Sequence, residues 1–246
     1  METQLEKRLL ELYNRAETRG IYVESHFLTE GEQGLLASLL PQGAYTLEGG
    51  FAEAERCIAV FGRAEELGYP WESTLCLLQI APKDMKFSEE LTHRDFLGAL
   101  LNLGIKRELT GDILIKDRCG YLFVLEQIAP FLQENLERVR HTAVRVTPLA
   151  ALPEGVAVQF EERVVVAASN RLDALICAVW NLSRSEGKEL VEKEKVSVVG
   201  KTVTDPAYGV PEGMRVSVRG YGRFYYDGEA GRTRSDRCRM RVRVFI

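Results

Sequence analysis

The stretch RLDALICAVWNLSRSEGKELVEKEKVSVVGKTVTDPAYGVPEGMRVSVRGYGRF, residues 171–224, decides the fold of this chain. Its first apolar residues recur at steps of three and four, which predicts a short amphipathic helix. Ser183 followed by Glu186 forms a capping box, so a second helix should begin at Arg184. This helix places Arg184 and Lys188 four residues apart on one face, and their charges should project together.

A small β unit follows the two helices in the sequence. Residues 196–199 and 214–218 are rich in valine, which predicts two strands. Gly200 predicts a turn after the first strand, and Asp205 predicts another turn before the second strand. The whole stretch therefore indicates two short helices and a β unit that packs with them.

The order of these motifs resembles the alpha-L RNA-binding motif, the domain named after small-subunit ribosomal protein S-four. R-L-D opens the first helix, S-R-S opens the second, and K-V-x-V begins at Lys195. Where the family usually reads G-x-V-x-V-N-G, this chain has Glu194 for the first glycine and Val199 before Gly200. The resemblance implies RNA binding through phosphate and 2′-hydroxyl contacts. The residues expected at this interface are Arg171, Ser183, Arg184, Ser185, Lys188, Lys195, Lys201, Arg219 and Arg223.

The charge of the chain is divided between its two ends. Residues 171–246 hold 15 Lys and Arg against 10 Asp and Glu, a net charge of +5. The preceding residues hold 17 Lys and Arg against 26 Asp and Glu, a net charge of −9. A basic end on an acidic body suits a protein that touches phosphate with one domain only. The alternative that the acidic N-terminal two-thirds binds a protein partner is left open.

The composition excludes several classes of protein. No apolar run of about 18 residues occurs, and the N-terminus lacks the apolar segment of a signal peptide, so we expect a cytoplasmic protein without membrane contact. The five cysteines are scattered and odd in number, which fits free thiols in a reducing compartment. The three histidines do not approach metal-ligand spacing. We therefore expect neither a metal nor a cofactor.

The chain of 246 residues is long enough for two or three small domains. Helical periods and strand-like runs alternate before residue 168, so the expected fold class is α+β. We expect an N-terminal α+β domain at 1–82 and a middle α+β domain, RRM-like or ferredoxin-like, at 83–167. The alpha-L domain with its basic C-terminal strand should then occupy 168–246.

A second resemblance covers nearly the whole chain. The stretch LTHRDFLGALLNLGIKRELTGDI, residues 91–113, together with GGFAEAER at 49–56 and the C-terminal motif, resembles the bacterial YlmH-type family of RNA-binding proteins. This resemblance implies a ribosome-associated role in translation quality control. It implies large-subunit ribosomal RNA, or the tRNA of stalled peptidyl-tRNA complexes, as the target. It also implies a gene neighbourhood of cell-division proteins.

The stretch at 91–113 contains a possible second contact surface. His93 and Arg94 lie at the predicted start of a helix, and Lys106 and Arg107 follow its end, so these four side chains could bind phosphate or RNA. The structural alternative is that Asp95 completes a helix cap and the cations are ordinary surface residues.

The last residues of the chain alternate strictly between arginine and other residues. Arg237, Arg239, Arg241 and Arg243 should line one face of a strand because side chains alternate across a strand. Two interpretations of this strand are open. Its arginines could contact RNA, or it could be a solvated edge strand that is protected from pairing by its charge.

The main enzymatic alternative is a pseudouridine synthase, because that class often carries an alpha-L domain and an R-L-D triplet. Here Ala174-Leu-Ile-Cys follows the triplet, and only 73 residues remain after Asp173. No catalytic set is found elsewhere in the sequence, so we expect a non-enzymatic RNA-binding protein without catalytic residues. The other alternative is a protein-interaction adaptor linked to cell division, in which RNA binding is incidental.

Overall fold

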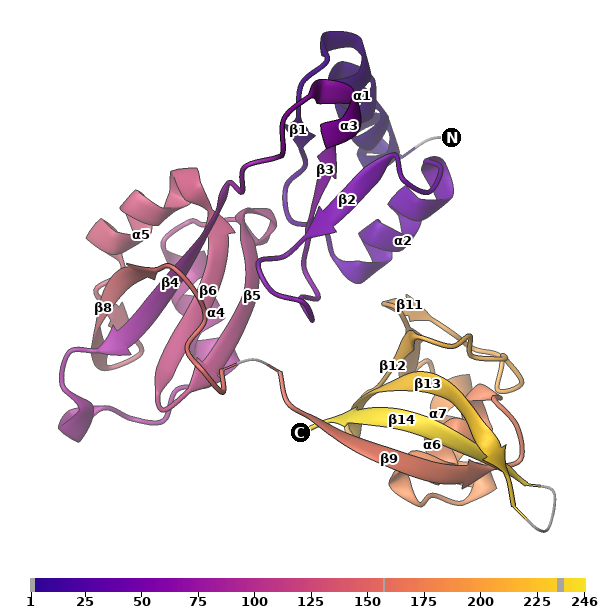
Figure 1. Ribbon diagram of the computed structural model, residues 1–246. Helices are drawn as coiled ribbons and strands as arrows, with labels where there is room; N and C mark the ends of the chain where they lie inside the picture. The colour runs from indigo at the N-terminus through magenta and orange to yellow at the C-terminus, as the bar shows by residue number, and fades with distance from the viewer. Residues whose placement is uncertain (1–2, 157, 234–236) are drawn as a thin grey trace. The chain divides into compact units, whose positions relative to one another are not determined.

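The computed structural model describes residues 3–156, 158–233 and 237–246. The chain divides into two compact units, residues 1–157 and 158–246, and each unit has a hydrophobic core of its own (Figure 1). Helices and antiparallel sheets occur in both units, which confirms the expected α+β class. In the described part of the chain, every helix is too short or too polar to cross a membrane.

The first unit begins with a small three-stranded sheet in the order β1-β3-β2, with two main helices beside it. A capping box of Thr29 and Glu32 starts the second helix. The core between sheet and helices contains Leu9, Leu36 and Phe61, each at most 1% exposed. The elements are α1 (Gln4–Arg19), β1 (Val23–Glu24), α2 (Glu30–Leu39), β2 (Tyr45–Glu48), β3 (Ile58–Phe61) and α3 (Ala64–Leu67).

The second half of this unit is a five-stranded antiparallel sheet in the order β5-β6-β4-β8-β7. Its order along the chain, strand-helix-strand-strand-helix-strand, is that of a ferredoxin-like fold with β7 added at the edge, as expected. Its strands are β4 (Leu75–Pro82), β5 (Thr110–Lys116), β6 (Cys119–Leu125), β7 (Arg138–Val139) and β8 (Thr142–Leu149). Its helices are α4 (His93–Asn102) and α5 (Ala129–Asn135), with the short 3-10 helices η1 (Met85–Phe87), η2 (Arg107–Leu109) and η3 (Glu126–Ile128).

The placement of β4 corrects the predicted boundary after residue 82. We expected this strand in the N-terminal domain, but it pairs with β6 and β8 at the centre of the middle sheet. The local sequence shows that residues 75–82 extend, and it does not show which distant strands supply their hydrogen-bond partners. The boundary between the two sheets therefore lies before β4.

Both faces of the five-stranded sheet are covered. Leu78 and Leu122 point to the side on which α4 and α5 pack. Leu77 and Phe123 point to the opposite side, where they contact Phe27 and other residues of the N-terminal half. The two halves thus share a core, which explains why residues 1–157 form one unit rather than two independent domains.

The second unit is a six-stranded antiparallel sheet, in the order β11-β10-β12-β13-β14-β9, with α6 and α7 together on one side (Figure 1). We expected β9 to close the middle domain, but it pairs with β14 over eight residues and belongs to this sheet. β14 is consequently internal, so the edge-strand interpretation of the C-terminal arginines is wrong. The elements are β9 (Phe160–Ala167), α6 (Leu172–Trp180), α7 (Arg184–Glu192), β10 (Val196–Val198), β11 (Lys201–Thr202), β12 (Met214–Val218), β13 (Gly222–Arg232) and β14 (Cys238–Phe245).

The two helices of this unit touch at a glycine. A Cβ atom placed on Gly187 of α7 would lie 2.3 Å from Cys177 Sγ and 3.0 Å from the carbonyl oxygen of Asp173, both in α6. These separations are shorter than van der Waals contact, so only glycine lets the helices approach this closely. Val191 of α7 and Ile176 of α6 are fully buried beside this contact.

We predict that Gly187→Ala destabilises the second unit by about 1–3 kcal/mol, because the added methyl group forces the helices apart. Scanning calorimetry of the full chain should show its transition lowered by at least about 4 °C. Gly98→Ala is the matched control, since a Cβ on this helical glycine of α4 meets nothing within 4 Å. It should stabilise the first unit by about 0.5–1 kcal/mol. An unchanged transition in Gly187→Ala would contradict the close helix contact.

Candidate nucleic-acid interface

The start of α7 is fixed by a capping box, as the sequence predicts. The Ser183 side chain accepts a hydrogen bond from Glu186 N at 3.3 Å, and Ser183 N donates to Glu186 Oε2 at 2.8 Å. Hydrogen bonds to the Glu186 carboxylate from the side chain and then the backbone of Ser183 lower the pKa of Glu186. The Ser185 hydroxyl lies 3.0 Å from the Ser183 hydroxyl and extends the polar start of the helix.

Three of the expected cations surround one hollow of about 410 Å³. Arg171 enters it from the start of α6, while Arg184 and Lys188 enter it from successive turns of α7. Asp173 and Cys177 of α6 also line the hollow. The predicted helix therefore brings Arg184 and Lys188 together and adds Arg171 from a different element.

The cations of this hollow differ in their partners. Arg171 donates two hydrogen bonds to Asp173, at 3.1 and 2.7 Å, and these bonds raise the pKa of Arg171. Lys188 forms a longer ion pair with Glu192, at 3.4 Å, on the exposed face of α7. Among the described residues, Arg184 has no carboxylate within ion-pair distance. Arg184 is therefore the cation of this hollow that is most available to an anion.

Other expected contact residues gather around a second hollow of about 610 Å³. Lys195, Arg219 and Arg223 line it from the ends of β10, β12 and β13. Lys201 lies on β11, and its neighbours Gly200 and Thr202, rather than Lys201 itself, line the hollow. The nine expected residues thus form two groups, one at the helices and one at the strand ends.

One residue of the second hollow was missed by sequence reasoning. Tyr221 is 44% exposed and lies between Arg219 and Arg223 along the chain. Its ring centroid is 5.9 Å from that of Trp180. The pattern R-G-Y-G-R, an aromatic ring held between glycines and cations, is the signal that could have identified it, because exposed rings stack on bases.

The chain departs from the family pattern at two positions where it adopts glycine-like backbone angles. Glu194, in place of the usual glycine, has φ of 57°, and Val199 has φ of 47°. Left-handed angles are rare for residues other than glycine and strained for a β-branched valine. Val199 and Gly200 form the tight turn between β10 and β11, so this turn carries backbone strain at Val199.

The structure does not bring together the residues of the second contact surface that was predicted in the stretch 91–113. Arg107 is half-buried, and its Nη1 donates to Thr110 O, Thr110 Oγ1 and Gly111 O at 2.6–3.2 Å. Arg56 donates in turn to Arg107 O at 3.0 Å. Burial, and then the charge of Arg56, lowers the pKa of Arg107 to about 10. The Arg107 side chain is therefore engaged by its own loop, while Arg56 ties the two halves of the first unit together, and the place of Arg107 does not favour an RNA contact.

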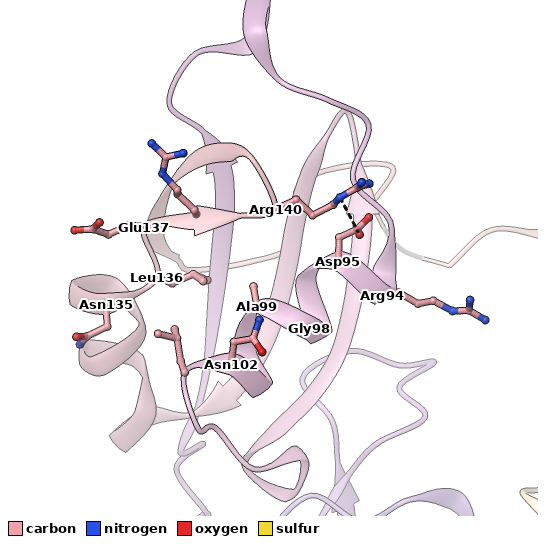
Figure 2. A pocket seen from close by; sticks show the side chains of 11 residues that line it. Arg94, Asp95, Gly98, Ala99, Asn102, Asn135, Leu136, Glu137 and Arg140 are labelled. Carbon is pink, nitrogen blue, oxygen red and sulfur yellow. Dashed lines mark ion pairs between the residues drawn. The ribbon is translucent and has the colours of Figure 1, made fainter.

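The other members of that surface do not form one cluster. Lys106 is exposed, and burial followed by the charge of Arg107 lowers the pKa of His93. Arg94 instead lines a hollow of about 510 Å³ between α4 and the segment that holds β7 (Figure 2). There Arg140 pairs with Asp95 at 3.7 Å, and Arg94 extends from the same helix in a different direction.

No group of three or more metal-ligating side chains occurs in the part of the chain that the structure describes. Asp173, the residue that a pseudouridine synthase would use as a nucleophile, is held by Arg171 and also accepts a hydrogen bond from Ala174 N at 2.8 Å. These bonds fix the carboxylate as part of the helix start.

Comparisons with known proteins agree with both resemblances. Residues 72–151 match a family described as "Putative RNA-binding domain in YlmH", and residues 171–216 match the S4 domain. A protein of Bacillus subtilis (strain 168) named "Ribosome-associated protein quality control protein P2" is 32% identical over 217 residues, which span 87% of this chain and 84% of the relative. The chain belongs to the YlmH family.

The predicted family membership is therefore confirmed. The matched families are RNA-binding families rather than enzyme families. A solved structure named "Cell division protein ylmH from Streptococcus pneumoniae" is similar at 22% identity and a TM-score of 0.48, covering 59% of this chain and 88% of that chain. The YlmH match begins at residue 72, just before β4, in agreement with the place of that strand in the middle sheet.

The S4 match of this YlmH-family chain contains the three cations of the helix hollow. Of the nine expected contact residues, Arg219 and Arg223 lie beyond its end at residue 216, and the other seven lie within it. All three cations of the helix hollow therefore lie within the matched domain, whereas the second hollow extends beyond it.

We predict that Ser183→Ala costs about 1 kcal/mol of stability, because the first turn of α7 loses the acceptor that caps it. Ser185→Ala, two residues further along, is the matched control and should change stability by less than about 0.5 kcal/mol. Denaturant unfolding of the full chain measures both variants. Equal stability of the two variants would contradict the capping role.

Proposed function

We propose that this chain is a ribosome-associated RNA-binding protein of translation quality control that docks structured RNA on α6 and α7. The observation that carries the proposal is the convergence of Arg171, Arg184 and Lys188 on one hollow inside the S4 match. Phosphate groups of RNA are the ligands that such a cluster of guanidinium and ammonium groups recognises.

The proposed contacts follow from where each cation stands. Arg184 is the main phosphate ligand, and Lys188 adds a second charge one turn along α7. Arg171 stays oriented by Asp173 and presents its remaining N–H groups to a phosphate or 2′-hydroxyl. Lys195 and Arg219 extend the contact toward the second hollow. If about four phosphates are neutralised, log K should fall with log[salt] with a slope of about −3 to −4.

The proposed target is large-subunit ribosomal RNA, or tRNA held on that subunit, in the cytoplasm. The name of the Bacillus subtilis relative, with its reference to ribosome association and protein quality control, supports this choice. The charge division of the chain supports the same unit as the docking end, since residues 171–246 carry a net charge of +5 and the remainder a net charge of −9. The acidic remainder is free for a protein partner.

The proposed role needs no chemical step. Asp173 is engaged by Arg171 and by the backbone of α6, so it is not poised as a nucleophile. Binding alone accounts for the arrangement of the hollow, in which cations surround a space rather than a reacting pair of side chains.

We predict that Arg184→Ala combined with Lys188→Ala releases the protein from large ribosomal subunits in sedimentation. Both residues are exposed, so the melting temperature should stay within about 2 °C. The loss of two phosphate contacts should weaken binding roughly tenfold or more at about 0.15 M salt and make the salt slope shallower by about two units. Nuclease treatment should release the unchanged protein as well.

The control is Lys7→Ala combined with Arg15→Ala, which removes two exposed cations from α1 in the acidic unit. This control should sediment with the subunits as the unchanged protein does. A folded Arg184 and Lys188 double variant with unchanged affinity and salt dependence would contradict the proposal.

A further inference from the structure

The six-stranded sheet has a second face, turned away from α6 and α7, and the proposed function uses only its β10–β12 end, at the second hollow. Cys238, Met240, Val242 and Val244 of β14 point into the core with the helices. The alternate residues of β14 point to the other face, which we name the open sheet face. Its outward residues on β14 are Arg239, Arg241, Arg243 and Phe245.

Cross-strand pairing continues this pattern onto the neighbouring strands. Arg243 stands opposite Tyr225 of β13 on one side and opposite Glu162 of β9 on the other. Phe245 stands opposite Phe160 of β9. Arg243 and Phe245 of β14 therefore lie beside aromatic rings of the neighbouring strands, an arrangement that a solvated face of unrelated charges would not require.

The three rings form one cluster. Phe160 and Phe245 meet edge to face with centroids 4.7 Å apart. Tyr225 and Phe245 are stacked with centroids 5.6 Å apart and an interplanar angle of 25°. All three rings are half-buried, so each keeps part of its surface toward solvent. Such a ring surface is a platform on which a base can stack.

Two guanidinium groups are fixed on this platform. Arg223 lies over Phe245, 4.4 Å from its centroid, and Arg243 lies over Tyr225, 4.8 Å from its centroid. Asp227 holds Arg243 through bonds of 2.8 and 3.1 Å. A guanidinium held over a ring is itself a stacking surface for bases, and its remaining N–H groups can bind phosphate.

The rest of the open sheet face supplies space and charge. A hollow of about 390 Å³ is lined by Arg241, Arg243 and Val164, and Val164 is 50% exposed. The charged residues that the strand pairing places on this face, apart from the buried Arg215, are Arg223, Arg239, Arg241 and Arg243, against Glu162 and Asp227. This excess of cations favours an anionic ligand over a basic or purely apolar protein surface.

We propose that the open sheet face is a second RNA-binding surface, separate from α6 and α7, that takes single-stranded RNA by base stacking on Phe160, Tyr225 and Phe245. Unpaired bases are required, because the faces of paired bases are hidden in the duplex stack. The rings span three adjacent strands, a width of roughly 10 Å, which suits about two or three bases. Arg239 and Arg241 bind the phosphates beside them.

The test is fluorescence anisotropy of the full chain with a labelled single-stranded RNA of about 12 nucleotides that lacks self-complementarity. Arg239→Ala with Arg241→Ala should weaken binding and make the salt slope shallower by about 1.4 units, the expected loss for two contacts to a single strand. Tyr225→Ala should weaken binding about 5-fold to 100-fold, whereas Tyr225→Phe keeps the ring and should bind as the unchanged protein does.

Two controls accompany these variants. Phe131→Ala removes an aromatic ring that is 41% exposed on α5 in the first unit, and it should leave the affinity unchanged. Arg184→Ala with Lys188→Ala should bind the single-stranded probe normally while losing structured ribosomal RNA. Comparing the two RNAs in this variant distinguishes an error in the inferred second surface from an error in the proposed function.

Three results would overturn the inference. The first is an absence of probe binding by the unchanged chain. The second is unchanged affinity in the Arg239 and Arg241 double variant, which should fold even if Tyr225→Ala does not, because Arg239 and Arg241 lie on the outward face of β14. The third is loss of probe binding in the Arg184 and Lys188 double variant but in none of the variants of the open sheet face. That result would place single-stranded RNA in the hollow at α6 and α7.

Discussion

The contact of α7 with α6 at Gly187 is the constraint on which the candidate interface depends. Because no side chain separates the helices there, Cys177 and the Asp173 carbonyl lie against the backbone of α7. This approach brings the start of α6 and the first turns of α7 to the edges of one hollow. The Ser183 cap fixes where α7 begins, and so determines which residues of α7 face that hollow.

The two units of the chain use their sheets differently. In the first unit, residues such as Leu77 and Phe123 are buried beneath the N-terminal half, so its ferredoxin-like sheet has no face left for stacking bases. In the second unit, the helices occupy one face of the sheet and aromatic and arginine side chains occupy the other. This contrast fits the charge division of the chain, in which only the second unit is basic.

Local sequence patterns predicted the features, such as helix caps and strand alternation, that depend only on residues adjacent in the sequence. The capping box at Ser183 and the alternation of β14 need only a few adjacent residues, and both are confirmed. The membership of β4 and β9 could not be predicted, because hydrogen bonds with distant strands decide it. The same reason hid the ring cluster, whose members come from three strands, and the burial of Arg107, which the distant Arg56 contacts only after folding.

Photocrosslinking tests the central assignment, RNA docking on α6 and α7, most directly. Full-length protein would be bound to large-subunit RNA that contains 4-thiouridine, irradiated, digested and analysed by mass spectrometry. Cys177 lines the hollow between Arg171 and Arg184 and offers a thiol beside the expected phosphates. The account predicts crosslinked peptides within residues 171–188. Crosslinks confined to residues 3–156 would contradict it.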